Sequence, residues 1–476
     1  MKTCFLTLLF LINLTLFSQT TAIPDANFEQ ALIDLGYDSG AIDGSVSTAN
    51  INMITGLSIE DKSITDLSGI EDFINLTSLN CKKNLLASLD LNNNKKLKYL
   101  QCSNNLLTNL NITNNLELEN ISCHNNKLIS LNLSKNIKLK DLSCHDNILT
   151  NLNISQNIKL EYLLCHNNRL TDLDASQNIE LENLACYSNR LNNIDVNQNI
   201  KLKQLNCHTN NLTSIDVTQN SLLTSLDCGG NNLKELDTKQ NPLLSDLGCS
   251  GNKLSNLNLE NNIVLKRLFC SSTELTKLDL SKNLLLFFLW CHTNNLTTLN
   301  LGENLELESL FCQNNKLTTL DFSNNQKLKD LDCSTNSLTS LNVKNGNNTN
   351  LTYFRVANNP NLTCIDVDNE VYSATNWTNI DTQTTFSVDC KGQVLATDKF
   401  DLKGFVIYPN PIKSKLTIKI EKEADYDLVN MNGQIILTGK LIFGENIINV
   451  SRLASGVYYL NVKTERIFVS KKVLKY

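Results

Sequence analysis

Proline and glycine are scarce in this chain, with 5 Pro and 17 Gly among 476 residues. This composition excludes a collagen-like protein and a long Gly-rich linker. Beyond the N-terminal region no segment reaches eighteen consecutive apolar residues, so we expect no transmembrane segment in the mature chain. The sequence also lacks a P-loop, a Gly-rich nucleotide fingerprint, a Ser-His-Asp constellation and paired catalytic carboxylates. We therefore expect neither an enzyme nor a bound cofactor.

The N-terminal segment has the pattern of a secretory signal peptide. One lysine precedes an apolar run from Cys4 to Phe17, and small polar residues follow it. The run is too short to span a bilayer, so residues 1–22 predict a signal peptide that is cleaved after Ser18 or Ala22. Cys4 lies at the start of the apolar run and not after it, so it is not placed as a lipoprotein anchor. We expect a protein that is secreted or attached to the outer cell surface.

Charge is spread unevenly along the chain, whose formal net charge is −6. Residues 400–476 carry 12 Lys and Arg against 7 Asp and Glu, a net charge of +5. Subtracting that +5 and the +1 of Lys2 from −6 leaves −12 on the remaining residues. An acidic main body repels a phosphate backbone, so we expect no nucleic-acid partner.

Sixteen cysteines would suggest a disulfide framework in a secreted protein, but their spacing indicates a repeat. Thirteen of them lie 21 residues apart without interruption: Cys81, Cys102, Cys123, Cys144, Cys165, Cys186, Cys207, Cys228, Cys249, Cys270, Cys291, Cys312 and Cys333. A chain of this length is too long for one compact core, and a fixed 21-residue period predicts a solenoid instead.

Each period contains the leucine-rich-repeat pattern L-x-x-L-x-L-x-x-N-x-L. One copy comprises Leu97, Leu100, Cys102, Asn105 and Leu107, with cysteine in a leucine position. Leu100 and Cys102 are two residues apart on a short strand, so both side chains point to the interior. Buried cysteine packs as a small hydrophobic group, and parallel side chains on neighbouring strands suit disulfides poorly. We interpret the cysteine ladder as core packing.

The other strand positions define the expected binding face. Tyr99, Gln101 and Ser103 alternate with the inward residues, so we expect these three positions of every turn to face the open, concave side. Asn105 recurs because its amide satisfies backbone groups where the strand turns a corner, which predicts a ladder of asparagines.

The repeats extend beyond the cysteine ladder. Leu57 belongs to a first turn without cysteine, and Phe354 belongs to a last turn that short insertions displace. Residues 57–367 therefore predict about fifteen turns, with a parallel sheet roughly 70 Å long at ~4.8 Å per strand.

Covers are expected at both ends, because a terminal turn exposes its core. Residues 23–56 predict an N-terminal helical cap, with a helix from Pro24 to Leu35 that Gly36 ends.

Residues 368–390 predict the C-terminal cap. Cys364 and Cys390 lie off the 21-residue period, on either side of Trp377. We expect a disulfide between them, which stabilises the cap by about 3.5 kcal/mol if it acts through chain entropy. The alternative is two further buried thiols. Residues 391–403 are polar and unpatterned and predict a linker.

From residue 404 to 476 the pattern changes to alternating strands, which predict a small all-β sandwich. Asn432 and Gly433 indicate a tight hairpin. The seven expected strands are Phe405–Tyr408, Lys415–Ile420, Tyr426–Met431, Gln434–Thr438, Asn446–Val450, Val457–Val462 and Ile467–Leu474. The predicted fold is thus an α/β-type leucine-rich-repeat solenoid, with a parallel sheet on its concave face and few helices, followed by an all-β sandwich domain.

Two stretches resemble known families. The 21-residue cysteine-bearing repeat resembles the bacterial internalins, especially their cysteine-ladder type, which implies a surface adhesin. The motifs Tyr408-Pro409-Asn410-Pro411, Gly456-Val457-Tyr458-Tyr459-Leu460 and Lys471-Lys472-Val473-Leu474-Lys475 resemble the type IX secretion sorting domain of Bacteroidetes. That second resemblance implies recognition by the export machinery at the outer membrane. The internalin cell-wall sorting signal is missing, so wall attachment does not carry over.

All five histidines lie in the column directly after the cysteine: His124, His145, His166, His208 and His292, with Tyr187 filling the place before His208. Neighbours about 4.8 Å apart suit a shared metal or a pH-sensitive strip. No regular carboxylate accompanies them, so we favour simple duplication of a Cys-His-x-Asn repeat and expect no metal site.

Aromatic residues gather in the column directly before the cysteine. Phe269, Trp290 and Phe311 occupy three consecutive turns, with Phe288 beside them. Arg267 and His292 flank this group, and Asp330 and Asp332 follow as a possible polar edge. Exposed aromatic clusters rimmed by polar groups are typical of binding hot spots. The alternatives are a local register shift that buries the rings, or rings that simply pack on one another.

These features predict an adhesin-like binding protein that holds a protein ligand on its concave face. The alternative is an accessory protein that captures a surface glycan for nutrient uptake, because stacked rings also suit a sugar face.

Overall fold

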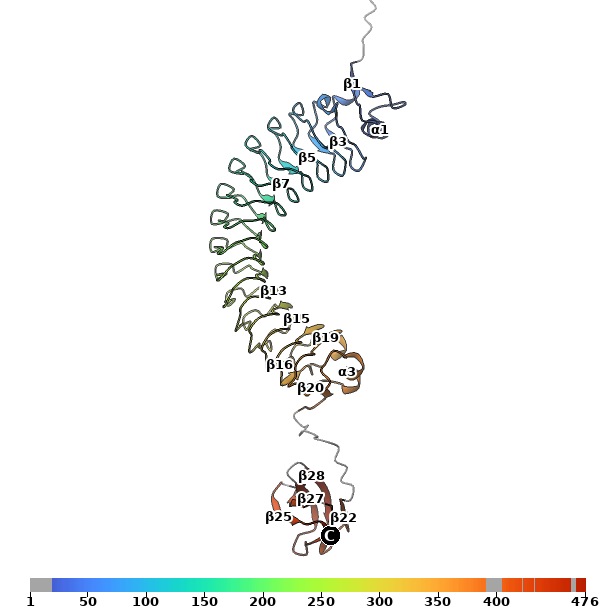
Figure 1. The fold of residues 1–476 in the computed structure, drawn as a ribbon, viewed down its shortest axis with the longest axis vertical. Coiled ribbons are helices and arrows are strands. Elements are labelled where there is room, and N and C mark those ends of the chain that lie inside the picture. Colours follow the sequence, from blue (N-terminus) through green and yellow to red (C-terminus); the bar gives the residue numbers. More distant parts are fainter. Residues whose placement is uncertain (1–18, 391–404, 422, 432, 464–467) are drawn as a thin grey trace, which may run out of the picture. The chain divides into compact units, whose positions relative to one another are not determined.

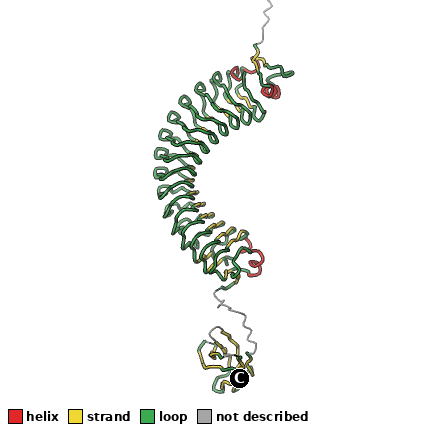
Figure 2. Tube along the Cα trace, viewed as in Figure 1, coloured by secondary structure: helices red, strands yellow, loops and turns green. Residues whose placement is uncertain are grey.

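The computed structural model describes residues 19–390, 405–421, 423–431, 433–463 and 468–476. They form two compact units that divide between Val388 and Asp389. The first unit is a curved solenoid whose main strands line the inner side of the arc (Figure 1). Loops make up most of each turn (Figure 2). The predicted solenoid with few helices is confirmed.

One 15-stranded sheet forms the concave face, in agreement with the expected number of turns. Its strands pair in parallel with chain neighbours, apart from the last steps, where β15 pairs with β17 and β17 with β19. The strands are β3 (Gly56–Ser58), β4 (Ser78–Asn80), β5 (Tyr99–Gln101), β6 (Asn120–Ser122), β7 (Asp141–Ser143), β8 (Tyr162–Leu164), β9 (Asn183–Ala185), β10 (Gln204–Asn206), β11 (Ser225–Asp227), β12 (Asp246–Gly248), β13 (Arg267–Phe269), β14 (Phe288–Trp290), β15 (Ser309–Phe311), β17 (Asp330–Asp332) and β19 (Tyr353–Arg355).

The centre of each strand points into the core. Leu100 and Leu289 are completely buried, as are all thirteen ladder cysteines, which are free thiols. Burial raises the pKa of Cys81 to about 12. The inward register expected from the 21-residue spacing is therefore present at every turn.

Two asparagine ladders satisfy the backbone where the chain leaves the sheet and where it returns. The Nδ2 of Asn105 donates to the carbonyls of Cys81 and Cys102, both at 3.1 Å, and its Oδ1 accepts from the N–H of Leu86. Further round the turn, Nδ2 of Asn115 donates to the carbonyls of Leu91 and Asn94. Because each amide bonds to the preceding turn, the ladders join successive coils.

The N-terminal cap begins earlier than the sequence indicates. β1 (Thr20–Ala22) pairs antiparallel with β2 (Ser45–Ser47), so these residues belong to the folded cap, and cleavage after Ser18 preserves the strand. Helix α1 (Ala26–Asp34) starts two residues after Pro24, because the Asp25 side chain accepts from the N–H groups of its first turn. α2 (Thr48–Ile51) and the 3₁₀ turn η1 (Ile70–Asp72) complete this end.

A second parallel sheet, which the sequence did not indicate, runs through the last turns. It consists of β16 (Thr319–Asp321), β18 (Ser340–Asn342), β20 (Cys364–Asp366) and β21 (Thr385–Ser387). The 3₁₀ turn η2 (Asn348–Asn350) and helix α3 (Glu370–Asn376) accompany it.

Trp377 closes the C-terminal end of the core. Its ring stacks on Phe354 with centroids 4.2 Å apart, and its Nε1 donates to the carbonyl of Leu351 at 3.0 Å. Cys364 and Cys390 are disulfide-bonded, in contrast to the thirteen ladder cysteines.

The second unit contains the seven predicted strands, arranged in two antiparallel sheets. One sheet has β22 (Val406–Tyr408), β23 (Lys415–Ile420) and β26 (Gly444–Asn449), and the other has β24 (Ala424–Asn430), β25 (Ile435–Leu441), β27 (Gly456–Lys463) and β28 (Phe468–Lys475). Gly433 has a φ of 75°, as a hairpin turn requires, whereas Asn432 lies outside the described residues. The expected linker 391–403 also lies outside them.

Candidate functional site

Two columns of outward side chains cover the concave sheet, at the first and third residue of each strand. A third column, formed by the residues directly after the cysteines, is only partly accessible. Its histidines are half-buried, and Ser103 is buried with 2% of its surface exposed, so the expectation that Ser103 faces the open side is wrong. The chain turns its corner there, and larger neighbours cover a small side chain.

The aromatic patch consists of Phe269, Phe288, Trp290, Phe311 and Tyr353, from strands β13, β14, β15 and β19. Phe269, Trp290 and Phe311 pair directly across the sheet, so no register shift interrupts the column. The Trp290 ring lies 5.3 Å from Phe269 and 5.5 Å from Phe311, both edge to face. Trp290 is 37% exposed and the phenylalanines are half-buried. The rings therefore pack on one another and still leave an accessible apolar surface.

Tyr353 was not anticipated as part of this patch. Its ring lies 5.7 Å from Phe311, and the Arg355 guanidinium lies 5.0 Å from the Tyr353 ring centroid. The turn that carries both is displaced by two residues from the 21-residue period. Its ladder position is Val356, which lies 23 residues after Cys333 and is not a cysteine. Phe354 aligns with the inward leucines, so its neighbours Tyr353 and Arg355 belong on the concave face. Extending the outward columns to this last turn would have identified both residues.

Charged groups surround the patch. Arg267 forms an ion pair with Asp246, and the Ser309 hydroxyl donates to Asp330 at 2.5 Å. Asp332 is only 5% exposed, and Ser334 donates to it from both its N–H and its hydroxyl. Asp332 therefore stabilises the strand end and does not form the accessible polar edge that the sequence suggested.

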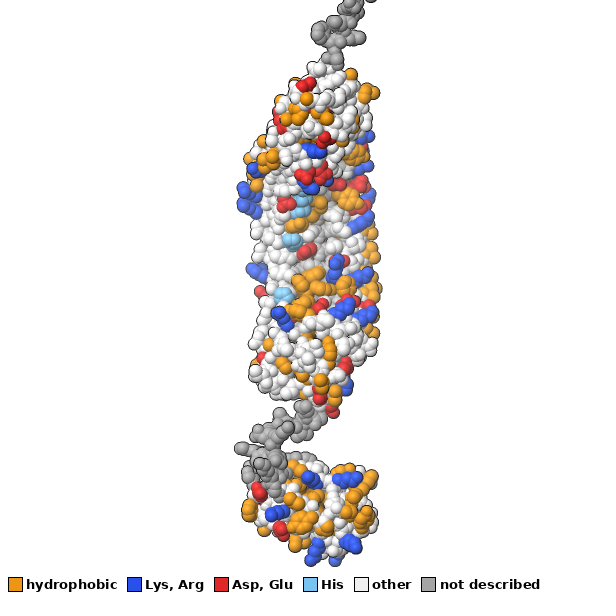
Figure 3. Space-filling view, turned by 90° about the vertical axis from the view of Figure 1, so that its right-hand side faces the viewer, with side chains coloured by type: hydrophobic (Ala, Val, Ile, Leu, Met, Phe, Trp, Pro, Cys, Tyr) orange, Lys and Arg blue, Asp and Glu red, His pale blue; other side chains and the backbone are white. Residues whose placement is uncertain are grey.

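The histidine stack is the second feature of this face and comprises His124, His145, His166, Tyr187 and His208. Successive ring centroids lie 4.2–4.3 Å apart, with interplanar angles of 9–19°. In the view onto the concave face, histidines line up along it and a group of hydrophobic side chains lies beyond them (Figure 3). His292 lies four turns beyond His208 and is separate from the stack. Its ring lies 6.3 Å from Trp290.

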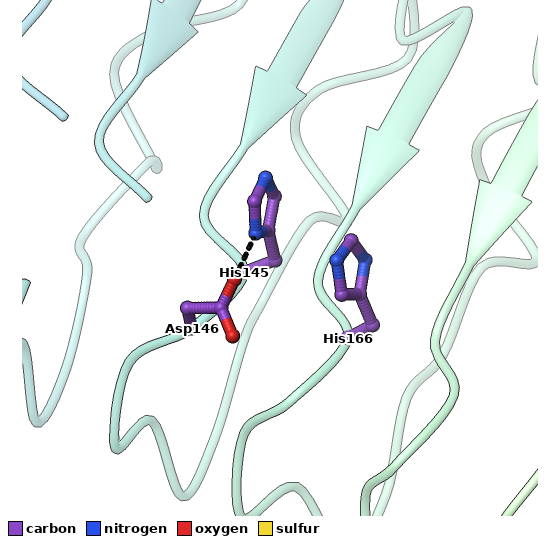
Figure 4. Close-up of side chains that lie close together, drawn as sticks. All are labelled: His145, Asp146 and His166. Atoms are coloured by element: carbon purple, nitrogen blue, oxygen red, sulfur yellow. Dashed lines mark hydrogen bonds and ion pairs between the residues drawn. The ribbon is translucent and has the colours of Figure 1, made fainter. Parts of the chain in front are cut away.

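Polar contacts differ from one stacked histidine to the next. The Nδ1 of His145 forms a hydrogen bond with the Asp146 carboxylate at 2.7 Å (Figure 4), whereas the Nδ1 of His124 bonds to the Ser122 hydroxyl. The Nδ1 of His166 is buried and has no hydrogen-bond partner. Burial and then the neighbouring imidazole of His145 lower the pKa of His166 to about 4.

Asp146 is the residue that the sequence interpretation overlooked. Together with His145 and His166 it brings ligand atoms of three side chains within 4.8 Å of one another. No regular carboxylate was expected along the histidine column, and Asp146 is a single carboxylate at one turn of it.

Comparisons with known proteins found similar proteins for both the solenoid and the C-terminal unit. Residues 406–476 match the family described as secretion system C-terminal sorting domain. No curated protein matches the sequence. Among the described residues, none of the helices has both the length and the apolarity that crossing a bilayer requires.

Similar solved structures are leucine-rich-repeat proteins. The functional domain of InlJ from Listeria monocytogenes, which includes a cysteine ladder, has a TM-score of 0.70 and 27% identity, covering 96% of this chain and 99% of that one. A leucine-rich-repeat protein of Leptospira interrogans has a TM-score of 0.58 and 22% identity, covering 71% and 97%. The internalin inlF from Listeria monocytogenes has a TM-score of 0.58 and 20% identity, covering 72% and 98%.

The last two likenesses show the fold alone, whereas the first also reproduces the cysteine ladder. The chain is thus a leucine-rich-repeat solenoid with a cysteine ladder, similar in structure to the InlJ domain, and its residues 406–476 match a type IX sorting domain, which directs secretion to the outer cell surface.

Proposed function

We propose that this protein is a non-enzymatic, adhesin-like surface protein that binds a protein partner through the aromatic patch. The observation that supports this proposal is the exposed ring of Trp290, which contacts three phenylalanines on the concave sheet. Tryptophan, tyrosine and arginine dominate the binding energy of protein interfaces. A solvated tryptophan in a packed aromatic group is therefore the strongest anchor that this face offers.

The charges around the patch suggest what the partner presents. Asp227 and Asp246 precede the aromatic strands, and Asp330 follows them. Arg267 pairs with Asp246 and Arg355 lies over Tyr353, so Asp227 and Asp330 are the acidic groups that remain for a partner at the edges of the patch. We expect the partner to place an apolar side chain against Trp290 and basic groups near the aspartates, because complementary charges guide association.

A matched pair of variants tests this proposal. Trp290→Ala removes the anchor, and Tyr99→Ala removes an aromatic side chain that is 45% exposed on the same sheet but lies outside the patch. Proteins from the native surface environment are cross-linked to the full chain and identified by mass spectrometry. A partner that the parent and Tyr99→Ala proteins capture and Trp290→Ala does not supports the proposal.

Equal capture by all three proteins contradicts the proposed anchor. Binding of the parent chain to a glycan array, lost in Trp290→Ala, would instead assign the patch to sugars.

A further inference from the structure

His145, Asp146 and His166 form a compact set of ligand groups that the proposed protein-binding function does not use. One ligand atom from each of these side chains lies within 4.8 Å of the other two, just beyond the carboxyl ends of β7 and β8. His145 and His166 come from equivalent positions in adjacent turns, and Asp146 directly follows His145 (Figure 4). Both histidines are half-buried and Asp146 is exposed, so solvent reaches the set.

The backbone holds Asp146 in place. Its φ is 51°, the left-handed conformation that the corner of each turn requires and that Asp and Asn tolerate best among side chains other than glycine. Its N–H donates to the His166 carbonyl at 3.1 Å, and Asn167 Nδ2 donates to its Oδ1 at 2.8 Å. One carboxylate oxygen is therefore anchored by Asn167, and the other faces the His145 ring.

We propose that His145, Asp146 and His166 bind a divalent transition-metal ion of the zinc class. Two imidazoles and one carboxylate suit Zn²⁺ and its neighbours, whereas Ca²⁺ and Mg²⁺ require oxygen ligands. Three protein ligands leave one tetrahedral position for water or for a group on a bound partner.

The movement that the site requires is small. Ligands at ~2.0–2.2 Å from a tetrahedral zinc are about 3.3 Å apart. The 2.7 Å contact between His145 and Asp146 must open by less than an ångström, and the atoms at 4.8 Å must approach. Rotation of two half-buried imidazoles provides both changes. The buried Nδ1 of His166 has no hydrogen-bond partner in the described structure, so this atom does not hold the ring in its present orientation.

Neighbouring rings of the stack hold the two imidazoles beside each other. Aromatic contacts with His124 and Tyr187 enclose the pair on both sides and limit how far the two rings move apart.

Zinc titration of the full, metal-free chain without a polyhistidine tag tests the site. Isothermal calorimetry is expected to show one Zn²⁺ per chain. Asp146→Asn and His166→Gln should each weaken binding at least tenfold, because even indirect partners of metal ligands change affinity by 10–100-fold.

These variants keep the fold, since Asn125 and Asn167 occupy the same corner as Asp146, and Gln313 occupies the same column as His166. His292→Asn is the matched control. His292 has the same position in its turn but no histidine neighbour, so the loss of its imidazole should leave zinc affinity unchanged. The proposal is overturned if the parent chain binds no zinc at 100 µM, or if either Asp146→Asn or His166→Gln binds zinc as the parent does.

Discussion

The histidine stack and the aromatic patch lie on the same concave sheet, yet their rings are arranged differently. In the stack the interplanar angles are 9–19°, whereas rings of the patch meet at 36–83°. The stack follows one column, so regularly spaced strands place its rings in parallel at 4.2–4.3 Å. The patch draws on two columns, and larger rings from neighbouring columns tilt to avoid one another.

This difference separates two kinds of surface built on one repeat. Parallel rings enclose their faces and leave polar nitrogens near the edge, which suits an ion. Tilted rings leave a face of Trp290 accessible, which suits a large apolar partner. A solenoid whose backbone barely changes thus acquires distinct chemistry from the side chains that occupy each column.

Both regions depend on the same inward cysteine ladder, and thiol chemistry gives the largest expected effect. Burial raises the pKa of the Cys81 thiol to about 12, well above its ordinary value. At pH 8 this shift lowers the thiolate fraction about a thousandfold. Only the thiolate reacts, so reactivity should rise with pH. We expect a bulky thiol reagent to modify no ladder cysteine in the native chain and all thirteen in denaturant.

The same experiment addresses the cap disulfide. Without reductant, Cys364 and Cys390 should resist alkylation even in denaturant, and mass spectrometry of the peptides should show them joined to each other. Rapid modification of the native ladder would mean that the cysteines face outward. The assignment of the inner and outer faces of the sheet would then be wrong, and with it the distinction between the stack and the patch.

The next largest effect concerns the core beneath the patch. Leu289 lies between Phe288 and Trp290 on β14 and is completely buried. Leu289→Ala should lower the free energy of unfolding by about 2–5 kcal/mol, because it leaves a cavity in a packed interior. Urea unfolding followed by circular dichroism measures the change. Leu163→Ala, its counterpart under the stack, should cost a similar amount, and unequal costs would mean that the two regions differ below the surface as well.

Interrupting the stack should have a smaller effect. Tyr187 contacts His166 and His208, each at a centroid distance near 4.2 Å. Tyr187→Ser should lower the free energy of unfolding by about 1–2 kcal/mol, since each aromatic pair contributes ~0.5–1.5 kcal/mol. Ser250 and Ser334 fill the same position in other turns, so the backbone tolerates the change. Unchanged stability would show that the rings align through strand spacing alone.

The 21-residue period was sufficient to predict the fold. Leucine and cysteine recur at fixed positions, so the strands, their register and the inward face followed from the spacing of Leu100 and Cys102. The sorting domain was equally legible, because its alternating strands match β22 to β28 closely.

Features that depend on local packing were not predictable in this way. The second sheet forms through loops whose repeated residues differ little from those of earlier turns. Ser103 and Asp332 are buried by neighbouring turns, which no single repeat reveals. Asp146 lies at a corner that asparagine, serine, threonine or glycine occupies in most other turns, so its carboxylate was hidden among small and polar residues of the repeat. A periodic sequence identifies the scaffold, and the departures from the period identify the sites.

A stability loss that is small beside that of Leu289→Ala separates a binding residue from a core residue in the patch. Trp290→Ala should lower the free energy of unfolding by about 1–2 kcal/mol, because it removes ring contacts with three phenylalanines but the ring is 37% exposed. Partner binding should fall by at least about 2 kcal/mol, or ~30-fold, if Trp290 is a hot spot. Paired urea-unfolding and affinity measurements on the same preparation show whether Trp290 acts in binding or in the core. A stability loss comparable with that of Leu289→Ala would place Trp290 in the core and leave the concave face without its proposed anchor.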